Sequence, residues 1–102
     1  MAILAIIRGK GLTKGMYESV RKEVKWDQNH PKGGVFHVSG FEDNGDMLVV
    51  DVWESADAMN EFFKTRLAPA MQKLKFPIPE VDVMVNTHSM VAYPALEKQH
   101  AK

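Results

Sequence analysis

The fold is decided by the stretch Met47-Leu-Val-Val-Asp-Val-Trp-Glu-Ser55, which runs directly into a segment with a regular apolar stripe. Residues 47–54 are rich in β-branched and aromatic side chains, which is typical of a strand, and Ser55 can cap a following helix. The next segment repeats apolar side chains at helical spacing, so this helix must be buried against a partner such as a sheet. Its stripe consists of Met59, Phe62, Phe63, Leu67, Ala70, Met71 and Leu74.

A hairpin is expected just before this strand. Residues 35–42 form another strand-like run, and Asp43-Asn44-Gly45-Asp46 separates them from residues 47–54. Asn-Gly between two apolar runs is a strong signal for a tight turn, because both residues tolerate a positive φ. We therefore predict an antiparallel pair of strands with Asn44 and Gly45 at the turn.

The helix predicted over residues 56–74 leads into the C-terminal part of the chain. Pro69 removes one backbone hydrogen bond inside it, so we expect a kink or a restart near residues 66–69. Residues 80–92 then alternate apolar and polar side chains, which predicts a long final strand. Residues 93–102 are expected to form a polar tail.

The N-terminal part supplies one more strand and one more helix. Residues 2–8 are a nearly continuous apolar run, typical of a strand in the middle of a sheet. Thr13 can cap the next helix, and residues 26–34 contain the proline and the glycine pair of a loop. The apolar stripe of this helix is Met16, Tyr17, Val20 and Val24.

The resulting order, β-α-β-β-α-β, is the α+β ferredoxin-like arrangement, with a four-stranded antiparallel sheet. We predict one domain over residues 1–92 and a tail over residues 93–102. Both helices are expected on one face of the sheet, because connections between parallel strands are right-handed. The other face would expose a patch containing Val49 and Trp53, so we predict a homodimer in which two sheets pack face to face.

Composition excludes several classes of protein. The 13 basic and 13 acidic residues cancel, which argues against a nucleic-acid-binding surface. The chain has no cysteine, so disulfides, thiolate ligands and cysteine nucleophiles are absent. No apolar run is long enough to span a membrane, and the N-terminal run lacks the basic leader of a signal peptide. We predict a cytoplasmic protein without a nucleic-acid or membrane partner.

The element order, together with Val49-Val-Asp-Val-Trp-Glu-Ser-Ala-Asp-Ala-Met-Asn-Glu-Phe-Phe63 and Arg66-Leu-Ala-Pro69, resembles the dimeric α/β-barrel superfamily. Within it, the chain is similar to the antibiotic-biosynthesis-monooxygenase-like proteins. The resemblance implies a dimer in which each subunit holds a pocket between its sheet and its second helix, with Trp53 on the pocket wall. Some members oxidise polycyclic aromatic substrates with oxygen and no bound cofactor, whereas others isomerise or dechlorinate small ring compounds.

Other members of the superfamily degrade haem, and the resemblance gives no support for that activity here. Those relatives carry an asparagine on the first strand and a histidine on the second helix. Residues 2–8 contain no asparagine, and Phe62 and Phe63 stand where the histidine would be expected.

The face on which His37 lies depends on the register of the hairpin. A strict two-residue turn would place His37 opposite Val52, under the helices. A bulge near Gly40 would instead set it opposite Asp51 or Trp53, on the barrel side of the sheet. An imidazole without a partner under the helices would cost about 1–3 kcal/mol, so we favour the bulge.

An aspartate can orient a histidine for general-base work, so His37 and Asp51 are the candidate catalytic pair for an acidic phenol or enol. A structural histidine bonded to Asp51 explains the pattern equally well. Arg66 would meet an anionic substrate or form a rim salt bridge, and His88 would reach the pocket or the dimer seam. The four histidines lack ligand spacing, and no nucleotide motif is present, so neither metal nor cofactor is expected. The predicted substrate-binding residues are Trp53, Phe62, Phe63, Arg66 and His88.

These features favour a small homodimer that binds a small apolar or aromatic molecule, and the resemblance implies that it acts as a cofactor-independent monooxygenase-like enzyme. Two alternatives stay open. One is a non-redox isomerase or lyase that uses the same pocket. The other is a non-catalytic dimer that binds a ligand or is associated with stress.

Overall fold

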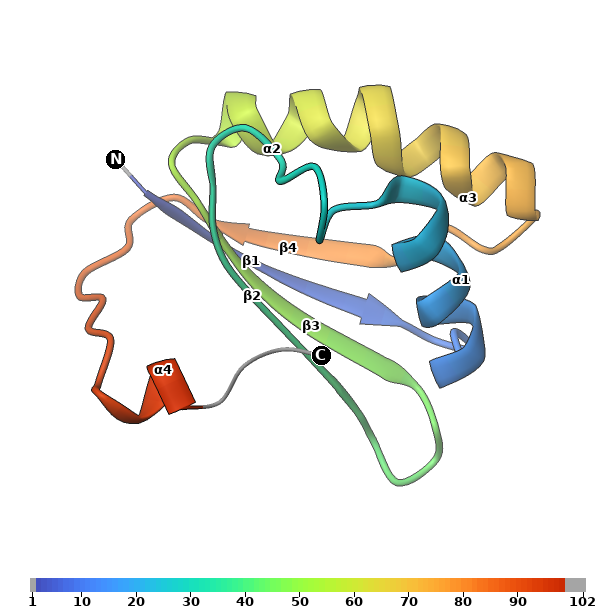
Figure 1. Cartoon of the computed structure of the whole chain (residues 1–102), viewed down its shortest axis with the longest axis horizontal. Coiled ribbons are helices and arrows are strands. Elements are labelled where there is room, and N and C mark those ends of the chain that lie inside the picture. The colour runs from blue at the N-terminus through green and yellow to red at the C-terminus, as the bar shows by residue number, and fades with distance from the viewer. Residues whose placement is uncertain (1, 99–102) are drawn as a thin grey trace.

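The computed structural model describes residues 2–98, which form a four-stranded antiparallel sheet with helices packed on one face (Figure 1). The strands lie in the order β2-β3-β1-β4, so β1 and β3 are central. This is the ferredoxin-like α+β fold, as predicted. The strands are β1 (Ile3–Gly9), β2 (Gly34–Phe41), β3 (Met47–Trp53) and β4 (Glu80–Met84).

Two helical segments connect the strands. Helix α1 (Lys14–Val24) begins after Thr13, whose Oγ1 accepts a hydrogen bond from the Met16 N–H at 3.2 Å. Helix α2 (Ala56–Phe62) begins after Ser55, whose Oγ accepts from the Ala58 N–H at 3.1 Å. Both predicted caps are therefore present, because each hydroxyl satisfies an N–H that the first helical turn leaves unpaired.

The second helical segment changes its winding before Pro69. Helix α2 passes into a π-helical turn, η1 (Phe63–Leu67), and helix α3 (Ala68–Leu74) follows. Pro69 cannot donate a backbone hydrogen bond, and its ring would crowd the preceding turn of a regular α-helix. The wider π turn accommodates the ring, and it gives the restart predicted near residues 66–69.

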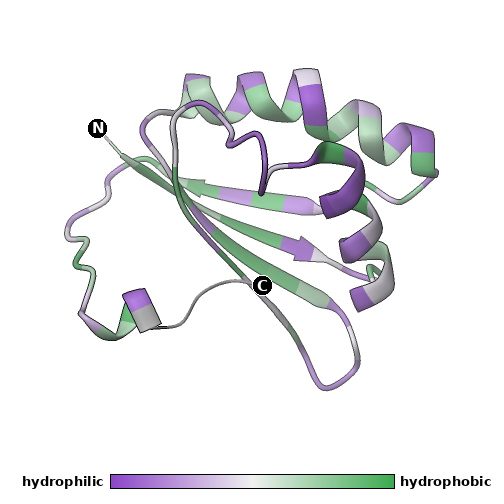
Figure 2. Cartoon of the chain, viewed as in Figure 1, coloured by the Kyte–Doolittle hydropathy of each residue, from purple (hydrophilic) through white to green (hydrophobic). Residues whose placement is uncertain are grey.

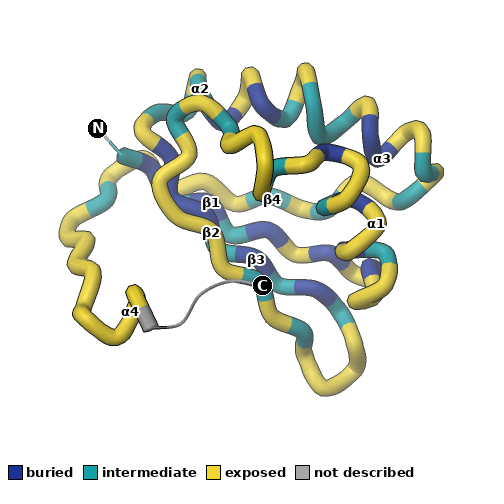
Figure 3. The backbone as a smooth tube through the Cα atoms, in the orientation of Figure 1, coloured by how far each residue is buried: buried dark blue, intermediate teal, exposed yellow. Residues whose placement is uncertain are grey.

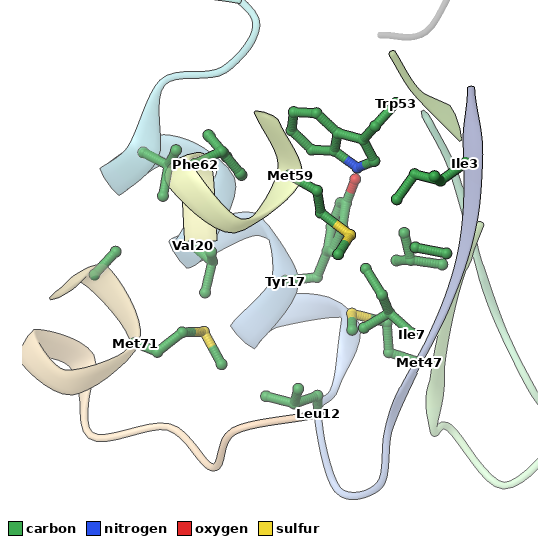
Figure 4. Packing of buried hydrophobic residues seen from close by; sticks show 14 residues of the cluster. Ile3, Ile7, Leu12, Tyr17, Val20, Met47, Trp53, Met59, Phe62 and Met71 are labelled. Carbon is green, nitrogen blue, oxygen red and sulfur yellow. The ribbon is translucent and has the colours of Figure 1, made fainter. Parts of the chain in front are cut away.

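The face of the sheet that packs against the helices is buried, and its centre is formed by β1 and β3. In the antiparallel register, Ile3 lies opposite Trp53, Ala5 opposite Asp51 and Ile7 opposite Val49. All of these side chains are buried, and Figure 4 shows the apolar members of the core between sheet and helices. The prediction that Val49 and Trp53 lie on the uncovered face is therefore wrong.

The uncovered face, which points away from the helices, instead carries Leu48 and Val50 of β3. Val52 points to the same side of the sheet but is buried, at 7% exposure. Because alternate residues of a strand point to opposite faces, an error of one position exchanges the two sets. Residues 47–53 are apolar at almost every position, so this sequence gives no parity signal. In Figure 2, β1 and β3 are hydrophobic along most of their length, whereas the helices alternate between hydrophobic and hydrophilic residues.

The final strand is shorter than predicted. Strand β4 ends at Met84, which pairs with Leu4, and β1 itself begins only one residue earlier, at Ile3. The strand stops because its partner stops, so the prediction of a strand to residue 92 is wrong. The chain beyond is largely exposed and contains the short helix α4 (Ala95–Lys98) (Figure 3). Residues 99–102 of the predicted tail lie outside the described residues.

Candidate active site

The β2-β3 hairpin places His37 opposite Asp51, through a turn that differs from the prediction. The Glu42 N–H bonds to the Asp46 carbonyl at 2.8 Å, and Gly45, with φ of 91°, donates to the Glu42 carbonyl at 2.8 Å. The turn thus contains three residues instead of two, which alone brings His37 opposite Asp51.

Two parts of the predicted register are therefore wrong. The irregularity in β2 lies between Gly34 and Phe36 and not at Gly40. His37 also lies on the helix side of the sheet, because its partner Asp51 faces the helices. It lies beside α1, however, and not beneath the second helix, and its side chain keeps 37% of its exposure. The imidazole of His37 is not left without a hydrogen-bond partner on the helix side, because Asp51 lies there as well.

Asp51 is held at both carboxylate oxygens. Its Oδ1 lies 2.6 Å from Nδ1 of His37, and its Oδ2 accepts from Nε1 of Trp53 at 3.4 Å. Among residues 2–97, Asp51 is the one charged side chain that is buried, at 6% exposure. A buried carboxylate is stable only with donors on its oxygens, so Nδ1 of His37 carries the proton and Nε2 is the acceptor.

Tyr17 of α1 completes a chain of hydrogen bonds that sequence analysis missed. Its hydroxyl lies 2.7 Å from Nε2 of His37, so in the neutral tautomer Tyr17 donates and His37 accepts. From the sequence, Tyr17 is predicted only to be one of the apolar residues in the stripe of the first helix. The available signal was its hydroxyl, because a buried tyrosine normally requires a hydrogen-bond partner.

Burial raises the pKa of Tyr17 above the ordinary tyrosine value of 10.0. Loss of water around the phenol is the largest cause, because it disfavours the charged tyrosinate. Ser39 and Arg21 act in the opposite direction, whereas Glu18 and Asp27 raise the pKa further. Tyr17 is therefore a neutral hydroxyl throughout the physiological range.

The raised pKa of Tyr17 predicts a loss of stability in alkali. The unfolded chain loses this proton near pH 10.0 and the folded chain only at higher pH, so the free energy of unfolding falls between the two values. Below pH 10.0 the contribution is fully present. Denaturant unfolding across this range should show a steeper fall for Tyr93→Phe, which keeps Tyr17, than for Tyr17→Phe. Equal slopes would contradict the assignment.

A cavity of about 860 Å³ adjoins the hydrogen-bonded chain, and Tyr17, His37 and Asp51 all line it. Phe62 and Phe63, two of the residues that we predict to bind substrate, also contribute to its wall. Aromatic rings with a few polar groups are typical of sites for small organic molecules. The further aromatic rings that line the cavity belong to Trp26, Phe36 and Trp53.

The other two predicted substrate-binding residues, Arg66 and His88, are not among the residues that line the cavity. The Arg66 guanidinium donates through Nη2 to the carbonyls of Val24 at 2.9 Å and Asn29 at 2.8 Å, and it lies 5.2 Å from the Phe62 ring centroid. It thus holds the loop after α1, which supplies Trp26 to the cavity wall. His88 is exposed in the segment after β4.

We predict that Arg66→Met lowers the free energy of unfolding by about 2 kcal/mol, because two backbone carbonyls lose a charged donor. Denaturant unfolding measures this loss. Lys64→Met is the matched control, since Lys64 lies on the same helical turn and is exposed. Similar losses in the two variants would show that Arg66 does not hold the loop.

Residues 2–98 also lack the features of a metal centre and of a membrane-spanning segment. No group of three or more His, Asp or Glu side chains in this part of the chain is placed to bind a metal ion. No helix in the same range is both long and apolar enough to cross a membrane.

Comparison with known proteins identifies the fold. No family model matches the chain, and no curated protein matches it in sequence. Among solved structures, SnoaB, a cofactor-independent oxygenase from Streptomyces nogalater, matches with a TM-score of 0.63 and 16% identity, over 87% of this chain and 96% of that chain.

Two further structures match equally well. The ActVA-Orf6 monooxygenase of Streptomyces coelicolor, in complex with nanaomycin D, gives a TM-score of 0.64 and 13% identity over 90% of this chain and 93% of that chain. A conserved protein from Methanosarcina mazei gives a TM-score of 0.64 and 9% identity, over 85% of this chain and 94% of that chain. The chain therefore has the fold of the antibiotic-biosynthesis-monooxygenase-like proteins, and the resemblance is confirmed at this level.

Proposed function

We propose that this protein is an enzyme that binds a small aromatic molecule in the cavity and removes a proton from its phenol or enol group. The observation that carries the proposal is the pairing of His37 with Asp51, at 2.6 Å, on the wall of a largely aromatic cavity. A histidine whose tautomer is fixed by a carboxylate is suited to accept a proton at its other nitrogen.

Removal of this proton would be the first step of a cofactor-independent oxygenation. A phenolate is richer in electrons than its phenol, so it reacts more readily with dioxygen, which is the oxidant in this proposal. Two matched structures with the same fold are an oxygenase and a monooxygenase, which supports this reaction class. Trp53, Phe62 and Phe63 would form walls that hold an apolar ring system near His37.

Oxygen uptake tests the reaction class. Alizarin is a suitable probe, because it is a planar three-ring phenol whose neutral and ionised forms differ in colour. We expect the protein to consume oxygen with this probe or a related hydroxyanthraquinone, and His37→Ala to bind the probe without consuming oxygen.

Each alternative gives a different result. An isomerase or lyase would convert the ring compound without using oxygen, and that activity would still require His37. A non-catalytic binding protein would bind the probe with no turnover in either variant. An unaltered rate in His37→Ala would exclude His37 as the base.

We also propose that the protein is a homodimer in which the uncovered sheet faces pack together. Central strands β1 and β3 place Leu4, Ile6, Leu48 and Val50 on that face. At the sheet edges, Val38 and Met84 lie on the same face, at 47% and 50% exposure. An apolar face of this extent is typical of a protein interface.

Native mass spectrometry of Val50→Lys tests this assembly. A lysine in the middle of two packed sheets would bury an unpaired charge, so we expect the dimer of the unaltered protein to dissociate into monomers. Ile78→Lys, which alters an apolar side chain at 67% exposure away from the sheet face, should remain dimeric. A monomeric unaltered protein would contradict the proposal.

A further inference from the structure

The acceptor nitrogen of His37 is already occupied. Nδ1 bonds to Asp51 at 2.6 Å, and Nε2, the nitrogen that would accept a proton, bonds to the Tyr17 hydroxyl at 2.7 Å. A ligand that bonded directly to Nε2 would have to displace this hydroxyl. The buried Tyr17 would then lose a hydrogen-bond partner, which is unfavourable.

The surroundings of Tyr17 fix the position of its hydroxyl. The rings of Trp26 and Phe41 pack edge-on against the Tyr17 ring, at centroid distances of 5.7 Å and 6.0 Å. The His37 ring lies nearly parallel to it, with an angle of 11° between the planes. Tyr17 lines the cavity from the helix side and is only 7% exposed, and Figure 4 shows it between α1 and the sheet.

We propose that Tyr17 is the catalytic residue that touches the ligand and that it passes the ligand's proton to His37. This inference rests on the proposed function, and it reassigns the contact with the ligand from His37 to Tyr17. The hydroxyl oxygen has lone pairs left after donating to Nε2, so it can accept a hydrogen bond from a phenol in the cavity.

The transfer moves two protons in one direction. The O–H bond of the ligand breaks as its proton bonds to the Tyr17 oxygen, and the original Tyr17 proton moves to Nε2 of His37. The ligand becomes a phenolate, Tyr17 is again a neutral hydroxyl that donates to it, and His37 becomes an imidazolium beside the Asp51 carboxylate. No free tyrosinate forms, which suits a phenol whose pKa burial raises.

The charged groups around Tyr17 do not replace His37 in this role. Arg21 and Glu18 on α1 and Asp27 in the following loop act on Tyr17 through their charges. Arg21 is bound to Asp27 at 2.7 Å, so its positive charge is largely balanced. On the sheet side, the titratable groups that are hydrogen-bonded in series with Tyr17 are His37 and Asp51.

The test compares the colour of bound alizarin in three proteins at one pH. Tyr17→Phe removes the hydroxyl with little change of shape, and Tyr93→Phe is the matched control, because Tyr93 is the other tyrosine and is 72% exposed. We expect Tyr17→Phe to lower the ratio of ionised to neutral bound probe by about tenfold or more, the effect of one lost hydrogen bond to an anion. Tyr93→Phe should match the unaltered protein.

The outcomes separate this inference from the proposed function. If Tyr17→Phe ionises the probe as well as the unaltered protein does, Tyr17 is structural and only the inference fails. If the unaltered protein binds the probe but does not ionise it, the proposed function fails and the inference fails with it.

A second comparison does not depend on how well Tyr17→Phe folds. In a Tyr93→Phe background, growth with 3-fluorotyrosine labels Tyr17 alone and makes its hydroxyl a stronger donor. We expect the apparent pKa of the bound probe to fall on fluorination, because the donor contacts the phenolate. An unchanged pKa of the probe would overturn the inference.

Discussion

Replacing Asp51 with asparagine should lower turnover by a factor of about 10² to 10⁴, the range that a correctly positioned general base contributes, because His37 loses the carboxylate that fixes its tautomer. The amide has one acceptor and one donor where the carboxylate has two acceptors. Its oxygen can bond to only one of the two donors present, Nδ1–H of His37 or Nε1–H of Trp53. If the amide N–H turns toward His37, the imidazole must change tautomer, and its Nε2–H then opposes the Tyr17 hydroxyl proton.

Steady-state oxygen uptake by Asp51→Asn measures the effect, and circular dichroism verifies that the fold is retained. Asp82→Asn is the matched control, because Asp82 pairs with Arg8 on exposed side chains outside the cavity. We expect the control to keep nearly full activity. Full activity in Asp51→Asn would mean that the pair has a structural role only.

Replacing Trp53 with alanine should lower the free energy of unfolding by about 3–5 kcal/mol, the range typical of a large aromatic residue removed from a core. Trp53 is 3% exposed, and its ring lies 5.4 Å from that of Phe62 and 6.5 Å from that of Phe63, between centroids. The variant loses this packing and also the indole N–H that bonds to Asp51. Since a domain of this size is stabilised by only about 5–15 kcal/mol, much of the total would be lost.

Denaturant unfolding of two further variants separates the contribution of the Trp53 ring from that of its N–H group and from that of a less buried tryptophan. Trp53→Phe keeps a ring but removes the N–H, so its loss reports mainly on the bond to Asp51. Trp26→Ala removes the chain's other tryptophan, which is only partly buried, and should cost clearly less. A loss for Trp53→Ala no greater than that for Trp26→Ala would contradict the packing described.

The order of elements could be predicted because its signals are local. Thr13 and Ser55 each cap a helix within three residues of themselves, and Pro69 affects the turn around it. The face of β3 could not be predicted, because both faces of residues 47–53 are apolar. The end of β4 could not be predicted either, because it is set by the start of β1, far away in the sequence.

The candidate site, like the fold, could be predicted from the sequence only in part. His37 and Asp51 lie in adjacent strands of one hairpin, so their pairing followed from a small number of possible registers. Asn44 and Gly45 marked the turn, but they do not distinguish a turn of two residues from one of three. Tyr17 approaches from another element, and the partners of Arg66 are backbone carbonyls, which carry no residue-specific signal.

Visible absorbance of protein-bound alizarin as a function of pH is the most direct test of the central claim, that His37 and Asp51 ionise a phenol in the cavity. We expect the bound probe to ionise at a lower pH than in water, and we expect His37→Gln to bind the probe but to lose this shift. If the probe binds both proteins and ionises in each at its value in water, the cavity is a binding site without a base, and the proposed function is wrong.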